Sequence, residues 1–293
     1  MRLALVLITL CGLLVGPASA QDLDQAIAQL GSPDAETRAR AACTISRFRA
    51  EGSAAVPALI SILNDGTVLP HDVCKNILGQ RWRFQRGWDR PGTSPSQEAA
   101  HALGHIGRAA LDPLHRLVAS GDVPQRLGVV RALREIEDPT SVPVLTNRVT
   151  QESNAEVRAA MAGALGSIEE PDAIDALGTL IGDRDIIVRE QAAWALGAIE
   201  SRRGVSKLLP ALADASPVVR EMAAWALGAI EDPAAVSSLI PLLGDSDPAV
   251  REQTAWALGS IGDEAASEAL IALMDDRDVE VRRMAVWALS EMD

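Results

Sequence analysis

Four tryptophans that recur at one interval could bind a ligand. Trp194 is followed by Trp225, Trp256 and Trp287, each 31 residues after the one before. Tryptophan is favoured at interface hot spots, and a large exposed apolar surface marks a binding site. The spacing therefore predicts a ladder of tryptophans that contacts a partner.

Two more columns of side chains accompany these tryptophans. One reads Glu190, Glu221, Glu252 and Arg283, and the next reads Gln191, Met222, Gln253 and Met284. Carboxylates attract cationic groups, and indole and thioether groups supply apolar contact. The combination predicts a groove that holds an extended basic or amphipathic peptide.

Cysteine and histidine occur earlier in the same register. Cys43 and His101 occupy the tryptophan position, and His105 follows one helical turn later. In an exported protein, Cys43 and Cys74 predict one disulfide, which would close a loop of about 30 residues and stabilise the fold by about 3 kcal/mol. A zinc site is the alternative, although the His101-x-x-x-His105 spacing arises on any exposed helix face.

Motifs for catalysis are missing from the sequence. It contains no Gly-x-Ser-x-Gly, no His-Glu-x-x-His and no glycine-rich phosphate loop. Most carboxylates recur every 31 residues, and a repeated residue is far more often architectural than catalytic. We therefore expect no enzymatic activity, no cofactor and no catalytic residue.

The elements that must position these columns are repeated pairs of helices. The string from Val188 to Ile199 returns at 219–230 and 250–261, and with changes at 281–292. A capped first helix, as at Asp232-Pro233, is followed by a short turn and an alanine-rich second helix. Neither helix can bury its apolar stripe alone, so the units must stack.

The pattern predicts an all-α, right-handed α-solenoid of about eight helix pairs, which forms a single domain over residues 21–293. The expected pairs span residues 22–51, 52–107, 108–137, 138–169, 170–200, 201–231, 232–262 and 263–293.

The motif Val-Arg-x-x-Ala-Ala-x-Ala-Leu-Gly-x-Ile, with Asp six residues before the Arg, resembles the HEAT-like repeat named after the phycobilisome lyases. The resemblance implies that second helices line the concave face and that Asp and Arg form a ladder between repeats. The ladder residues are Asp183, Arg189, Asp214, Arg220, Asp245, Arg251, Asp276 and Arg282. The His-Glu pairs of the family's iron hydroxylases are absent from the sequence.

Helix geometry places the tryptophans away from the core of their own helix. At 100° per residue, Trp194 lies about 160° from Leu196, the centre of the buried stripe. Two interpretations stay open: the ring is exposed in the groove, or it packs against the neighbouring repeat.

One insertion, at about residues 65–95, interrupts the second repeat. It is basic and aromatic, and it carries Trp82, Phe84 and Trp88 together with His71 and Cys74. A long inserted loop is usually functional or disordered. We interpret it either as a cap on the N-terminal repeats or as a ligand-contacting loop that includes Trp82 and Trp88.

Residues 1–20 have the features of a signal peptide: Arg2, an apolar run, and Ala18-Ser19-Ala20 before a cut at Gln21. No later run is long enough to span a bilayer. The chain has 293 residues and a formal net charge of −13, which disfavours nucleic acid as a partner. We expect export to a bacterial periplasm or the extracellular space.

These observations predict a non-catalytic exported scaffold that binds a protein or peptide. A metal-dependent enzyme or sensor centred on His101 and His105, and a glycan-binding solenoid that uses the tryptophans, are the alternatives. The sequence leaves the oligomeric state open.

Overall fold

The computed structural model describes residues 19–70, 73–74, 77 and 92–292. The predicted signal peptide up to residue 18, and Trp82, Phe84, Trp88 and His71 of the insertion, lie outside the described residues. Among those that are described, no helix is both long and apolar enough to cross a membrane.

The second helices of the repeats form one layer. They are α2 (Ala35–Ser46), α5 (Pro95–Ile106), α7 (Val123–Ile136), α9 (Ala155–Ile168), α11 (Ile186–Ala198), α13 (Pro217–Ile230), α15 (Pro248–Ile261) and α17 (Val279–Glu291). Successive members of this layer pack on one another.

The first helices form the other layer and are short. They are α1 (Ala20–Gln29), α3 (Val56–Ser61), α6 (Leu111–Leu117), α8 (Val142–Val149), α10 (Ile174–Leu180), α12 (Val205–Leu208), α14 (Val236–Leu239) and α16 (Ser267–Leu273).

Short 3-10 turns flank the first helices. They are η1 (Arg49–Ala55), η3 (Gly107–Ala110), η4 (Pro139–Ser141), η5 (Pro171–Ala173), η6 (Arg202–Gly204), η7 (Leu209–Ala213), η8 (Pro233–Ala235), η9 (Ile240–Gly244) and η10 (Glu264–Ala266).

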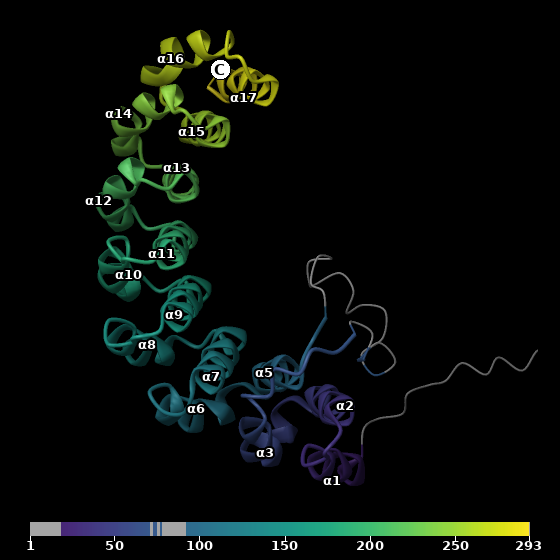
Figure 1. The fold of residues 1–293 in the computed structure, drawn as a ribbon. Helices are drawn as coiled ribbons and strands as arrows, with labels where there is room; N and C mark the ends of the chain where they lie inside the picture. Colours follow the sequence, from purple (N-terminus) through teal and green to yellow (C-terminus); the bar gives the residue numbers. More distant parts are fainter. Residues whose placement is uncertain (1–18, 71–72, 75–76, 78–91, 293) are drawn as a thin grey trace, which may run out of the picture.

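The two layers curve into an open arc (Figure 1), with the second helices on its inner side and the first helices on its outer side. The α-solenoid predicted from the repeats is therefore confirmed, and its second helices line the concave face.

Helix boundaries follow the chemistry of the turns. Asp247 caps α15 by accepting a hydrogen bond from the backbone N–H of Ala249, and Pro248 takes the first helical position, where no N–H is needed. At the other end Gly262 adopts the left-handed conformation, with φ of 69°, which glycine adopts without steric cost. Asp185 and Asp278 cap α11 and α17 in the same register, whereas α13 ends at Glu231, which adopts the left-handed conformation with φ of 53°.

The core between the layers consists mainly of small and branched aliphatic side chains. Leu196, Leu227 and Leu258 are fully buried, as are the alanines beside them. Small side chains let neighbouring second helices approach closely, which explains why a chain with only 3% aromatic residues still forms a continuous core.

The base of the insertion is closed by backbone hydrogen bonds. Leu69 and Thr93 exchange two N–H to carbonyl bonds of 2.8 Å each. Beside them, Cys43 and Cys74 are joined in a buried disulfide whose Cα atoms lie 6.0 Å apart. The predicted cysteine pairing is therefore present, and it ties one arm of the insertion to α2.

Candidate functional site

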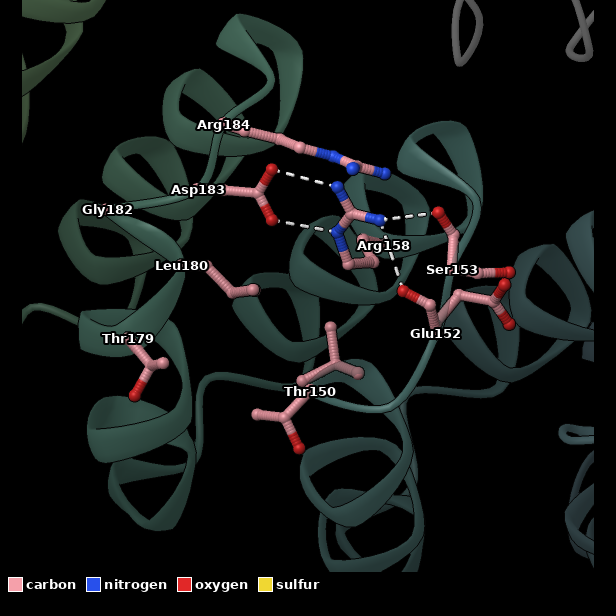
Figure 2. Close-up of a pocket in the computed structure, with 10 residues that line it drawn as sticks. Thr150, Glu152, Ser153, Arg158, Thr179, Leu180, Gly182, Asp183 and Arg184 are labelled. Carbon is pink, nitrogen blue, oxygen red and sulfur yellow. Dashed lines mark hydrogen bonds and ion pairs between the residues drawn. The ribbon is translucent and has the colours of Figure 1, made fainter.

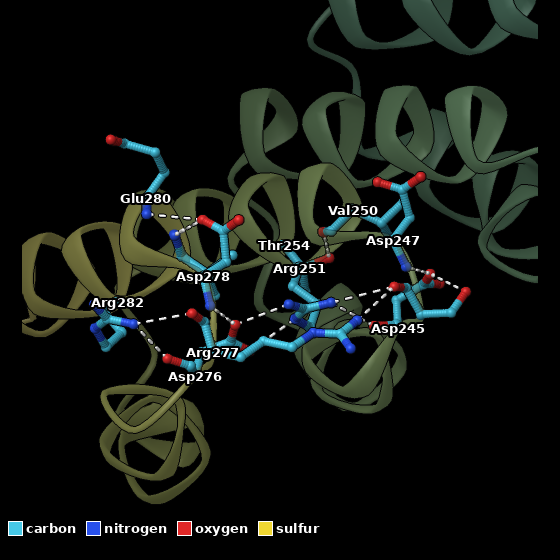
Figure 3. Close-up of polar contacts among 12 residues, drawn as sticks. Asp245, Asp247, Val250, Arg251, Thr254, Asp276, Arg277, Asp278, Glu280 and Arg282 are labelled. Carbon is cyan, nitrogen blue, oxygen red and sulfur yellow. Dashed lines mark hydrogen bonds and ion pairs between the residues drawn. The ribbon is translucent and has the colours of Figure 1, made fainter.

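An arginine–aspartate ladder connects the successive C-terminal repeats from Arg158 onward. In Figure 3, Arg251 donates from Nε and Nη2 to the carboxylate of Asp276 at 2.7 and 2.8 Å, and from Nη1 to the carbonyl of Asp245 at 2.9 Å. The same fork joins Arg158 to Asp183, Arg189 to Asp214 and Arg220 to Asp245. Arg282 donates to the carbonyl of Asp276 at 2.7 Å.

The ladder carboxylates are held in their charged form. The hydrogen bond from Arg189, with added charge attraction, lowers the pKa of Asp214, and Arg220 and Arg251 do the same for Asp245 and Asp276. Because these groups also cap the turns, as Asp214 does by accepting from the N–H of Ser216, the ladder is structural.

Sequence reasoning missed the upstream rungs of this ladder. Arg38 donates to Asp65 at 2.7 Å, and Arg126 donates to the buried Glu152 at 2.9 Å. The change from Asp to Glu concealed the second rung. Ser96 replaces the arginine in the repeat with the insertion, and its hydroxyl donates to the carbonyl of Leu63 at 2.6 Å.

A pocket of about 440 Å³ opens beside the rung of Arg158 (Figure 2). Residues from the ends of α8 and α10 line it together with Arg158 and Asp183. Arg158 also donates to the carbonyls of Glu152 and Ser153. Since its main polar groups hold the ladder together, this pocket is not the candidate site.

The tryptophan column packs against the neighbouring repeat, which is one of the two interpretations that the sequence left open. Trp194, Trp225, Trp256 and Trp287 are all half-buried and pack against the core. Each ring edge lies over a glycine of the preceding repeat: a Cβ on Gly197 would be 2.8 Å from Cζ3 of Trp225. One part of each indole therefore joins two repeats, and each side chain stays partly exposed.

The acidic column lies on the same helices. Glu190, Glu221 and Glu252 are half-buried, whereas Arg283 is exposed. Burial raises the pKa of Glu221, and the negative charges of Asp247, Glu252 and Glu190 raise it further. Glu190, Glu221 and Glu252 thus form an acidic strip along α11, α13 and α15, in which like charges oppose one another. Gln191, Met222 and Gln253, the neighbouring predicted residues, are also half-buried.

The tryptophan column meets a basic group at its N-terminal end. The guanidinium of Arg134 lies over the ring of Trp194, 5.8 Å from its centroid, and donates to the hydroxyl of Ser167 at 3.1 Å. Arg134 shows that a cation can stack on a tryptophan of this column. Arg131 occupies the tryptophan position of the repeat that contains α7, and Arg134 follows three residues later. The repeat pattern therefore gave no signal for Arg134.

A buried carboxylate lies next to the disulfide. Glu98 is fully buried and accepts a hydrogen bond of 2.6 Å from the hydroxyl of Thr93. Its other oxygen lies 3.4 Å from Sγ of Cys43. Cys43, Cys74 and Glu98 are close enough together to hold a metal ion. With the two sulfurs joined, however, their thiolates are not available as metal ligands.

His101 and His105 are in contact, and they lie on α5. Their Nε2 atoms are 3.1 Å apart, and the rings meet edge to face. Nδ1 of His101 lies 3.2 Å from Oε2 of Glu135 on α7. The sequence predicted that the two histidines share one helix face. It gave no signal for Glu135, which comes from the next repeat.

Comparison with known proteins supports the same architecture. A family model described as HEAT repeats matches residues 94–165, 142–214 and 205–290. Among curated proteins, no sequence matches this chain.

Solved structures that are similar include an engineered protein (24% identity, TM-score 0.49, covering 92% of this chain and 88% of the other). Another is the complex of CpcE and CpcF of phycocyanin lyase from Nostoc sp. PCC7120 (23%, 0.43, 95% and 97%). A third is human deoxyhypusine hydroxylase in complex with glycerol (22%, 0.38, 93% and 96%).

With TM-scores below 0.5, these similarities carry no conclusion about this chain. The family matches together extend from residue 94 to residue 290, which is well over half of the chain. This protein therefore belongs to the family of HEAT-repeat proteins.

Proposed function

We propose that this protein is a non-catalytic exported scaffold whose concave face binds an extended basic segment of another protein. The observation that carries the proposal is the acidic strip formed by Glu190, Glu221 and Glu252. Each recurrence of the repeat places another carboxylate beside the last, and the pKa of Glu221 is raised by burial and by its acidic neighbours.

Such a strip costs stability in the isolated protein, because like charges repel and partial burial weakens their solvation. A bound chain with Arg or Lys side chains would relieve both costs. The ladder carboxylates are instead matched with arginines within the fold. The contrast favours a cationic partner for the strip, and electrostatic complementarity of this kind gives specificity.

The tryptophans supply the apolar part of the proposed site. Their half-buried rings are fixed by contact with the preceding repeat, so little side-chain entropy is lost on binding. Arg134 on Trp194 illustrates the stacking that an arginine of the partner would make. A glycan that stacks on the same rings is the second candidate.

Export is part of the proposal. Its support is the signal-like sequence of residues 1–20 and the Cys43–Cys74 disulfide, a bond typical of oxidising compartments. Sequencing the N-terminus of protein recovered from the culture medium or periplasm tests it. A start at Gln21 supports export, and an intact leader on protein confined to the cytoplasm contradicts it.

The binding experiment uses the oxidised protein with EDTA and a ten-residue peptide in which Arg alternates with Leu. The triple substitution Glu190→Gln, Glu221→Gln, Glu252→Gln should weaken binding about tenfold, since three accessible ion pairs contribute about 0.5 kcal/mol each. Tryptophan fluorescence and calorimetry provide the readouts. Binding should weaken as salt rises.

A matched control removes three carboxylates from the outer layer by changing Glu170, Glu264 and Glu268 to Gln. The control should bind the peptide as the unmodified protein does. Equal weakening by both triple variants, or equal binding of a peptide with Glu in place of Arg, would contradict the proposal. Competition by a neutral oligosaccharide that depends on Trp225 but not on the glutamates would favour the glycan candidate.

A further inference from the structure

We propose that His101 and His105 form a binding site for a divalent late transition-metal ion such as Zn²⁺, Ni²⁺ or Cu²⁺. The site lies at the N-terminal end of the concave face and is separate from the proposed peptide site. The two Nε2 atoms would be the protein ligands, and Glu135 would orient one of the rings.

The geometry of the two nitrogens fits one ion. Their separation is 3.1 Å. Two nitrogens bound at about 2.0–2.1 Å to a single ion lie about 2.9 Å apart at a right angle and about 3.3 Å apart at a tetrahedral angle. Small ring movements would therefore accommodate the ion without a change in α5.

Glu135 fixes the orientation of His101. A carboxylate can only accept hydrogen bonds, so Nδ1 of His101 donates its proton to Oε2 of Glu135 across 3.2 Å. In the neutral ring, Nε2 then presents its lone pair toward His105. A carboxylate on the far nitrogen of a histidine ligand is the usual outer partner in protein metal sites, where it makes the imidazole a better donor.

The surroundings hold one histidine ring in place and leave the other accessible to an ion from solvent. The side chain of His101 is only 14% exposed, whereas His105 is exposed. Imidazole ligands suit Zn²⁺, Ni²⁺ and Cu²⁺. Two protein ligands leave further coordination positions for water or for a donor from a bound molecule.

The test is calorimetric titration of untagged, EDTA-treated protein with Zn²⁺ alone, repeated with Ni²⁺. The protein is kept oxidised, so that Cys43 and Cys74 cannot act as thiolate ligands. One equivalent should bind. His105→Ala should weaken binding by about 100-fold or more, because it removes the gain from joining two ligands in one site. Glu135→Gln should weaken it by about 10–100-fold.

His115→Ala is the matched control, since it removes an imidazole from α6, where His115 hydrogen-bonds Ser141 at 2.9 Å. It should bind metal normally. Circular dichroism without metal checks that each variant is folded, and ¹⁵N NMR should show both Nε2 signals of the pair shifting. No binding by the unmodified protein, or unchanged stoichiometric binding by His105→Ala, overturns the proposal.

Discussion

The regular C-terminal repeats and the irregular N-terminal repeats use one helical position in different ways. Five residues after the ladder arginine, the C-terminal part carries Trp four times, and each ring packs over a glycine of the preceding repeat. Two of the corresponding N-terminal positions carry Cys43, which is in a disulfide, and His101, which contacts His105 and Glu135.

This difference distinguishes residues that hold the repeats together from residues that could bind a ligand. A contact that recurs between identical neighbours, such as Trp225 over Gly197, holds successive repeats together. Residues that occur once bring groups from different repeats into particular combinations. The acidic strip is the exception, because it recurs and yet the pKa of Glu221 is raised by its neighbours. A repeated feature that costs stability favours a role in binding.

The largest expected effect concerns a regular rung. Arg220→Met would leave the largely buried carboxylate of Asp245 without its guanidinium, and we expect a loss of about 3 kcal/mol or more. In the irregular repeat, Ser96→Ala removes one hydroxyl hydrogen bond and should cost about 1 kcal/mol. Urea denaturation followed by circular dichroism measures both. Equal losses would show that the rung has no special role.

Reduction of the disulfide should act at the opposite end of the molecule. Cys43 and Cys74 are 31 residues apart, and opening this loop should cost about 3 kcal/mol. Because repeats interact with their neighbours only, backbone amides of α2 and α5 should exchange hydrogen faster, while those of α15 and α17 stay unchanged. Before reduction, the protein starting at Gln21 should contain no reactive thiol. Two labelled thiols would exclude the bond.

The next largest loss of stability should come from disturbing the close packing of second helices in the regular repeats. In Gly197→Ala the new Cβ would lie 2.7 Å from Cα of Ala226 and 2.8 Å from the ring of Trp225, so the helices must separate. We expect a loss of about 1–3 kcal/mol. Gly244→Ala, where the added atom meets nothing within 4 Å, should change stability by less than about 0.5 kcal/mol. Thermal unfolding compares the two variants.

Lowering the pH should destabilise the regular repeats, because the ladder carboxylates become protonated. Arg189 lowers the pKa of Asp214 below its ordinary value of 3.8, and Asp245 and Asp276 behave alike. A carboxyl group whose pKa is lowered on folding contributes stability above its unfolded value, and this is lost as pH falls through the folded value. Stability should therefore fall below about pH 4. In Arg220→Met, Asp245 should contribute less to this fall, because only the N–H of Asp247 and the hydroxyl of Ser246 still lower its pKa.

Glu221 should show the smallest effect, with the opposite sign. Its pKa is raised above the ordinary value of 4.5, so folding favours the protonated form and stability decreases as pH rises through that range. Glu221→Gln should raise the thermal midpoint slightly at pH 7 and weaken binding of the Arg–Leu peptide. A lower midpoint would show that the carboxylate makes a stabilising contact.

Much of the fold follows from local pattern. The Val-Arg string, the turn with Asp and Pro, and the alanine-rich second helices predicted the helix pairs and their stacking. The structure places Asp214 on Arg189 and joins Cys43 to Cys74. These features depend on one register or on one pair of residues, so the sequence displays them directly.

Other parts of the candidate sites depend on spacing between helices. The wheel for α11 shows only that Trp194 faces away from the core of its own helix. Its partial burial depends on how closely α9 approaches, which Gly166 decides from another repeat. In the same way, Glu135 meets His101 from the neighbouring helix, 34 residues away.

By itself, the sequence predicted the all-helical repeat and the columns of tryptophan and acid, because each results from a period carried by neighbouring residues, and it predicted the disulfide because only two cysteines follow the signal-like segment. The tertiary structure alone decided that the indoles are half-buried, that Glu98 lies against the disulfide, and that Glu135 meets His101. These contacts join different repeats, and their distances depend on how closely whole helices pack.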